Sequence, residues 1–207
     1  SNECFINGNE FALSNIEMEL SGGMMVGNRL MVSTMYGSNI TAGPISLNYF
    51  NAATFSLQNA VVTAMLKNRV YDGEYVFDGA TFDLRKNTLK NTDIDATGAS
   101  VNLSDNNTDR CTIDVSNAVS SYEFSRNHIR YNTTISLQRA QGQFVDNEIE
   151  QLELAGNDSN TSFGSNKLNN NSEVTLTNFA GSQFFGNSIT ASTIDLLDSA
   201  GDFNWNK

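Results

Sequence analysis

The sequence is poor in proline, cysteine, histidine and basic residues. Its 207 residues include one proline, two cysteines and one histidine, and 12 basic residues stand against 23 acidic ones, which gives a net charge of −11. This acidic balance argues against nucleic acid as a partner, because phosphate binding needs a net basic surface. No apolar run reaches the length of a membrane span, so membrane insertion is not expected, and no signal peptide is recognisable.

The chain contains instead a series of asparagines that are spaced 19 to 21 residues apart. In the second half each copy has the same flanks, as in Phe124-Ser-Arg-Asn127-His-Ile129 and Phe144-Val-Asp-Asn147-Glu-Ile149. The full series comprises eleven residues: Asn9, Asn28, Asn48, Asn68, Asn87, Asn106, Asn127, Asn147, Asn166, Asn187 and Asn206. A fixed period of this length is the signature of a repeat architecture.

Apolar residues keep their place relative to this asparagine. One lies three residues before it, another two residues after it, and a segment that alternates apolar and polar side chains begins about seven residues after it. Alternation with period two is typical of strands with one inward face. Three short strands per repeat predict an all-β fold, a right-handed single-stranded parallel β-helix of about eleven coils.

We expect the asparagines to stack in a buried ladder, with their amides hydrogen-bonded from coil to coil. We also expect each to adopt the left-handed backbone conformation of a tight corner, which Asn tolerates. A column of alanines, which includes Ala60, Ala80 and Ala99, should occupy another crowded corner. In this register Cys4 and Cys111 are about five coils apart, roughly 25 Å, too far for a disulfide.

The repeated apolar-x-x-Asn-x-apolar unit resembles the parallel β-helix repeats of the pectate-lyase-like superfamily, over essentially the whole chain. The resemblance implies a single domain over residues 1–207, which we expect to be a piece of, or continuous with, a longer protein. The superfamily includes polysaccharide lyases, glycoside hydrolases, phage tailspikes and non-catalytic surface proteins, so the resemblance leaves the function open.

Family enzymes carry their catalytic groups on the outside of the strand that begins about seven residues after the ladder. The acidic residues Glu74, Asp93, Asp95 and Asp114 take such outward positions on three successive coils. Carboxylates at this spacing can share a proton, hydrolyse a glycosidic bond or hold Ca²⁺. No other cofactor or metal is expected. Arg110 is the only nearby basic residue, and no catalytic motif of the family matches.

Two further features point to ligands. Exposed aromatic residues can stack on sugars, and Tyr49 and Tyr71 fall on the outer side of consecutive coils; Glu74 is grouped with them as a ligand-binding candidate, and Tyr122 is also expected to be exposed. Ten of the twelve basic residues lie within three positions of a ladder asparagine. We favour the interpretation that they neutralise acids at the same corner over a stripe that binds anions.

The leading hypothesis is a non-catalytic β-helix that is extracellular, on a cell surface or part of a virion. It would act as a rigid scaffold and bind a polysaccharide or cell-surface glycan, and the short loops suit a side-by-side homotrimer. The alternative is a polysaccharide lyase or glycoside hydrolase that uses Asp93, Asp95 and Asp114. A purely structural fibre segment is a third alternative.

Overall fold

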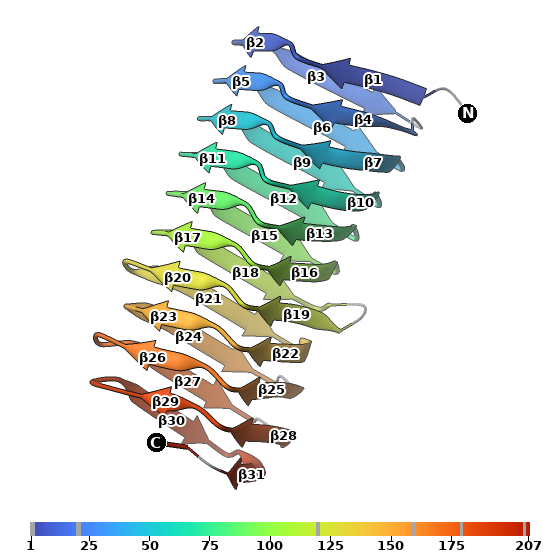
Figure 1. The fold of residues 1–207 in the computed structure, drawn as a ribbon. Coiled ribbons are helices and arrows are strands. Elements are labelled where there is room, and N and C mark those ends of the chain that lie inside the picture. The colour runs from blue at the N-terminus through green and yellow to red at the C-terminus, as the bar shows by residue number, and fades with distance from the viewer. Residues whose placement is uncertain (1–2, 20–21, 119–120, 159, 179, 205) are drawn as a thin grey trace.

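The computed structural model describes residues 3–19, 22–118, 121–158, 160–178, 180–204 and 206–207. Within them the chain winds as a right-handed parallel β-solenoid, and Figure 1 shows its thin three-sided coils stacked from one end to the other. The part of the chain that the structure describes contains no helix long and apolar enough to cross a membrane.

Each coil gives one strand to each of three parallel sheets, A, B and C. Sheet A contains β1 (Glu3–Asn7), β4 (Gly22–Val26), β7 (Thr41–Ser46), β10 (Val61–Leu66), β13 (Thr81–Arg85), β16 (Ser100–Ser104), β19 (Tyr122–Ser125), β22 (Gln141–Val145), β25 (Asn160–Gly164), β28 (Ala180–Phe185) and β31 (Ala200–Asn204). Sheet B contains β2 (Glu10–Ala12), β5 (Arg29–Met31), β8 (Tyr49–Asn51), β11 (Arg69–Tyr71), β14 (Thr88–Lys90), β17 (Asn107–Asp109), β20 (His128–Arg130), β23 (Glu148–Glu150), β26 (Lys167–Asn169) and β29 (Ser188–Ile189). Sheet C contains β3 (Asn15–Glu19), β6 (Thr34–Ser38), β9 (Thr54–Gln58), β12 (Glu74–Asp78), β15 (Asp93–Thr97), β18 (Thr112–Ser116), β21 (Thr133–Gln138), β24 (Leu152–Asn157), β27 (Glu173–Thr177) and β30 (Thr193–Leu197).

The strands pair in register from coil to coil, so equivalent positions form columns along the rod. Ile113 of β18 lies beside Ile94 of β15 and Ile135 of β21, and all three are buried. The residues three before the ladder show the same stacking, since the ring centroids of Phe144 and Phe163 lie 5.2 Å apart and their planes differ by 4°. The predicted fold is confirmed, because the strands stack in three parallel sheets around a continuous apolar core.

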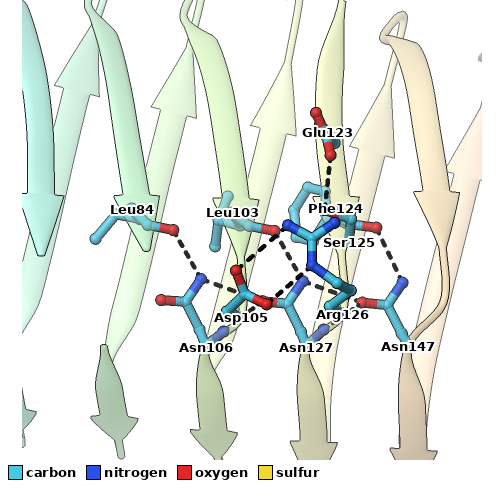
Figure 2. A network of polar contacts seen from close by, with 10 residues as sticks. All are labelled: Leu84, Leu103, Asp105, Asn106, Glu123, Phe124, Ser125, Arg126, Asn127 and Asn147. Atoms are coloured by element: carbon cyan, nitrogen blue, oxygen red, sulfur yellow. Dashed lines mark hydrogen bonds and ion pairs between the residues drawn. The ribbon is translucent and has the colours of Figure 1, made fainter. Parts of the chain in front are cut away.

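The asparagine ladder is confirmed and runs along the edge where sheet A meets sheet B. Figure 2 shows three of its members, Asn106, Asn127 and Asn147. The Asn106 amide nitrogen donates to the Leu84 carbonyl at 2.8 Å and to Asn127 Oδ1 at 3.1 Å. Asn106 Oδ1 accepts from both the backbone N–H and the side-chain amide of Asn87, at 2.9 and 3.1 Å. Each buried amide therefore ties its own coil to the coil before it and the coil after it.

The expected backbone conformation of the ladder asparagines is wrong. The left-handed residue at this corner is the one before the asparagine, and it varies in type: Gly27, Leu47, Lys67, Lys86, Asp105, Arg126, Asp146 and Ser165 all have positive φ. The asparagines themselves are absent from the positive-φ residues of the described chain. Asparagine is needed at the ladder for its amide, whereas the turn is made by its neighbour.

Each coil turns two more corners in the same way. The corner between sheets B and C has a left-handed residue such as Val32 or Asp72, and the corner between sheets C and A has one such as Asn59 or Gly79. The alanine column follows the last of these corners as expected, and Ala60, for example, is 1% exposed. Cys111 is buried and free, while the side chain of Cys4 lies outside the described residues.

Candidate functional site

The predicted acidic cluster lies on the outer face of sheet C. Glu74 pairs in register with Asp93 of the next coil, and Asp95 pairs in register with Asp114 of the coil after that. Because hydrogen-bonded coils are roughly 4.8 Å apart, these carboxylates form two neighbouring pairs on one face. The structure thus brings together the four residues that the sequence selected.

Asp114 is the residue of this acidic face whose pKa is shifted. Its pKa is raised because partial burial removes water from the carboxylate and because Asp95 carries the same charge, while a hydrogen bond from Ser136 acts in the opposite direction. Asp95 is partly satisfied by the Thr97 hydroxyl, which donates to its Oδ1 at 2.8 Å. A carboxyl that holds its proton more tightly than usual can serve as a general acid.

The acidic face has no cationic partner among the described side chains. Arg110, the nearby candidate, is directed to the corner instead, where its Nε donates to Asn91 Oδ1 at 2.9 Å and pairs with Asp109 at 3.4 Å. In the described residues, no three acidic, histidine or cysteine side chains are arranged to hold a metal ion. Binding of Ca²⁺ at this face stays a prediction.

One open hollow touches the acidic face at its edge. It measures about 540 Å³ and is lined by residues from Ala52 to Asp93, which include Asp72 and Glu74. Asp95 and Asp114 do not line it. The three residues predicted as catalytic therefore do not share one hollow.

Tyr49 and Tyr71 do meet, on the outer face of sheet B. Their ring centroids are 5.6 Å apart with the planes tilted by 35°, and the Arg29 guanidinium lies over the Tyr49 ring at 5.6 Å. Arg29 and Tyr71 thus pack against Tyr49, which leaves little of its ring for a sugar. Glu74 belongs to sheet C, so the structure does not group it with the two tyrosines.

Another hollow lies on the outer face of sheet A. A groove of about 610 Å³ crosses the strands from β10 to β25. Its lining includes a column of outward polar side chains, one per coil, that are neighbours in register: Asp83, Asn102, Glu123, Gln143 and Ser162. Sequence reasoning did not select this column, because it treated the strand before the ladder only as a source of core residues.

Asp83 and Glu123 are the two acidic residues that line the groove. The Asp83 carboxylate pairs with Arg85 Nε at 2.8 Å. Its pKa is nevertheless raised, because loss of water outweighs the opposing effect of Arg85 and because Glu123 adds a like charge. The Oδ1 atoms of Asp83 and Asn102 have no hydrogen-bond partner among the described residues. Both oxygens are buried.

Large side chains of the strands that line the groove point into the core. Tyr122, expected to be exposed, is buried, and its hydroxyl hydrogen-bonds with that of Thr161. It takes the inward position of Phe82 and Val101, five residues before the ladder. The next coil has Gly142 beside it, where a Cβ atom would lie 2.1 Å from the Tyr122 carbonyl oxygen. Only glycine fits this approach.

The single histidine does not form part of a catalytic group. His128 is half-buried on sheet B, and its Nε2 lies 3.8 Å from Glu148, which Lys167 also contacts at 3.1 Å. This is the setting of a surface histidine, as expected. Trp205 lies outside the described residues.

Comparisons with known proteins add no family. No family model matches the chain, and no curated protein matches it. Among solved structures, a trypsin-treated form of QnrB1, a plasmid-mediated fluoroquinolone resistance protein, is similar at 13% identity and a TM-score of 0.37, covering 96% of this chain and 92% of that one. The full-length form of QnrB1 gives 13% identity and a TM-score of 0.32, covering 99% and 93%. Values this low say nothing about function, and the resemblance to the pectate-lyase-like superfamily rests on the coil pattern alone.

Proposed function

We propose that the protein is a rigid, non-catalytic solenoid that binds a glycan chain in the groove of sheet A. The observation that carries the proposal is the groove of about 610 Å³ with one polar side chain per coil along it. Such a ligand places the protein outside the cell, on a cell surface or on a virion.

Three features of the groove suit a glycan. It is elongated across several coils, so it fits a chain rather than a compact molecule. Its lining presents amides, carboxylates and hydroxyls, and two of its acceptors have no partner within the described residues. Sugar hydroxyls can donate to and accept from the exposed amides, carboxylates and hydroxyls of this lining.

A glycan array with a groove-filling variant tests this proposal. Asn102→Tyr places a large side chain in the middle of the groove, at an outward strand position that accepts aromatic residues. We expect array binding by the wild type and its loss in this variant. Thr112→Tyr is the matched control, since Thr112 is an exposed strand residue of sheet C, and it should bind as the wild type does. Absence of any glycan ligand, or equal loss in both variants, would refute the proposal.

The alternative is an enzyme that uses the acidic face of sheet C. The raised pKa of Asp114 beside Asp95 is the observation that favours it. Assays for new reducing ends and for unsaturated products, run on the glycans bound in the array, distinguish the two functions. Turnover that Asp114→Asn abolishes would establish the enzyme, whereas the proposed function predicts binding without turnover.

A further inference from the structure

Within the described residues, four of the ten basic side chains near the ladder form a salt bridge with an acid: Arg29, Arg85, Arg126 and Lys167. Arg85 pairs with Asp83, and Lys167 pairs with Glu148 at 3.1 Å. Arg126 contacts Asp105 at 2.9 Å through Nε and at 3.3 Å through a second nitrogen, and Figure 2 shows this pair beside the ladder. Other basic residues of the later coils are not paired with an acid in this way, and Arg130, for example, donates to the Asn107 amide oxygen at 3.1 Å.

Four basic residues that form no salt bridge within the described chain lie together in two neighbouring coils. Lys67 and Arg69 belong to one coil, and Lys86 and Lys90 belong to the next. Within the described residues, none of the four side chains takes part in a salt bridge, whereas Arg29, Arg85, Arg110 and Arg126 all do. A protein with a net charge of −11 thus has a compact cationic patch.

The geometry of this patch follows from the coil register. Lys67 and Lys86 are the left-handed residues just before the ladder in consecutive coils, so they are neighbours at roughly 4.8 Å backbone spacing. Arg69 begins β11, and Lys90 ends β14 on the outer face of sheet B. Lys86 and Lys90 are four residues apart, about 13 Å along the chain. The four cations therefore frame an area of about one or two sugar units.

Stability does not explain the patch. Like charges on neighbouring strands are destabilising, and a left-handed conformation costs a lysine about 1 to 2 kcal/mol. Other coils meet the same corner requirement with Gly27 or with an acid such as Asp146. Lys67 and Lys86 are exposed. Their side chains therefore gain no stability from packing in the core that could offset these two costs. A negatively charged ligand would offset both unfavourable terms when it binds these lysines.

A tyrosine lies within this group of cations. Tyr71 is on β11, two residues after Arg69 and directly opposite Lys90 in the register. Tyr49 packs on one side of it with ring centroids 5.6 Å apart, and Lys90 lies on the side of the next coil. An aromatic ring beside cations is suited to a ligand that has both an apolar ring face and a negative charge.

We propose that Lys67, Arg69, Lys86 and Lys90 bind the anionic groups of an acidic polysaccharide, carboxylates or sulfates, with Tyr71 against the sugar. The patch ends abruptly, since the next coil presents Asp105 and Asp109, and Asp109 is the register neighbour of Lys90. A densely charged polymer such as DNA, with one charge per about 1.7 Å, would meet these acids. A polysaccharide with one charge per sugar fits the limited patch. The site is on different sheets and residues from the groove and does not depend on it.

Binding of polygalacturonate and of dextran sulfate by the full chain tests this site, with neutral dextran, duplex DNA and phosphatidylserine vesicles as comparison ligands. We expect binding of at least one acidic polysaccharide, weakened by salt because exposed charges are screened. In K67Q/K86Q the affinity should fall about tenfold or more, which is about 1.4 kcal/mol. The matched control K167Q/K207Q removes the same number of charges elsewhere and should stay within about twofold of the wild type.

Circular dichroism on both variants checks that the coils remain folded, and the two substituted lysines have no side-chain role in the core. Equal weakening in the two double variants would mean attraction by overall charge and would overturn the site. Binding of DNA or vesicles in preference to the acidic polysaccharides would overturn the ligand class. Asn102→Tyr should leave polyanion binding unchanged, so failure at the groove and failure at this site are distinguishable.

Discussion

The ladder edge and the outer faces of the solenoid differ in regularity and in how completely their polar groups are satisfied. At the edge, the amide of Asn106 makes four hydrogen bonds with two neighbouring coils. On the outer face of sheet A, by contrast, the equivalent position changes from Asp83 to Asn102 to Glu123, and acceptors remain without partners in the described chain. The difference indicates that the repeated residue builds the rod and that recognition belongs to the variable columns.

The largest expected effect is a difference in stability between alanine variants of two adjacent asparagines, Asn106 and Asn107. Asn106→Ala leaves the groups that its amide satisfied without partners in the core, and an unsatisfied buried group costs about 1 to 3 kcal/mol. We therefore expect a loss of about 3 to 5 kcal/mol in the free energy of unfolding, measured by urea denaturation. Asn107→Ala, one residue further on the outer face of β17, should cost less than about 1 kcal/mol. Similar losses in the two variants would remove the distinction between edge and face.

A smaller effect, of opposite sign, is expected at the corner between sheets B and C. Val32 has a φ of 48° and is 58% exposed, and this conformation is a genuine outlier for a β-branched residue. Val32→Asn should raise the free energy of unfolding by about 1 kcal/mol, because Asn accepts the left-handed conformation. Asn91 already occupies the same corner position with a φ of 47°.

The control for this corner is Val76→Asn, at an outward position in the middle of β12. Asparagine is unfavourable in strands, so this variant should be less stable than the wild type. Thermal unfolding of Val32→Asn, Val76→Asn and the wild type measures both effects. An increase in the free energy of unfolding in both variants would mean that the effect comes from the added polar surface and not from the left-handed corner.

The smallest effect concerns the pH dependence of the acidic face. The pKa of Asp114 is raised in the folded protein, so its favourable contribution is present at low pH and is lost as the pH rises through the folded pKa. Asp114→Asn should therefore be slightly more stable than the wild type at neutral pH, by at most about 0.5 kcal/mol. The difference should vanish as the pH is lowered through that pKa.

Asp105 provides the opposite case for the same titration. A hydrogen bond from Arg126 lowers its pKa, so its stabilising contribution is present above the unfolded pKa and disappears as the pH falls. Asp105→Asn should therefore be less stable than the wild type at neutral pH, and the two should converge in acid. Thermal unfolding of both variants between pH 3 and pH 7, roughly the range in which carboxyls titrate, measures the two signs together.

The parts of this molecule that repeat could be predicted from the sequence. Ladder residues such as Asn106 and core residues such as Ile113 recur with the coil period, so their columns and the pairing of Asp95 with Asp114 follow from spacing alone. The left-handed corner could not be assigned in this way. Leu47, Lys67 and Asp105 share that backbone conformation without sharing any side-chain chemistry.

The groove was missed for a different reason. The hollow is formed by side chains from several neighbouring coils, and no single position reveals how they pack together. The outward column from Asp83 to Gln143 was nevertheless visible as polar residues four before the ladder. The cationic patch was visible only as a bias in position, because the pairing of each cation depends on side-chain geometry.

The division between edge and face is tested most directly by one pair of values for Asn102→Tyr: its affinity for a glycan found on the array, and its free energy of unfolding. If outward positions of sheet A recognise the ligand and the ladder holds the coils, the affinity falls at least about tenfold. The free energy of unfolding then stays within about 1 kcal/mol of the wild type. An unchanged affinity, or a loss of affinity that merely follows a loss of stability, would contradict the account.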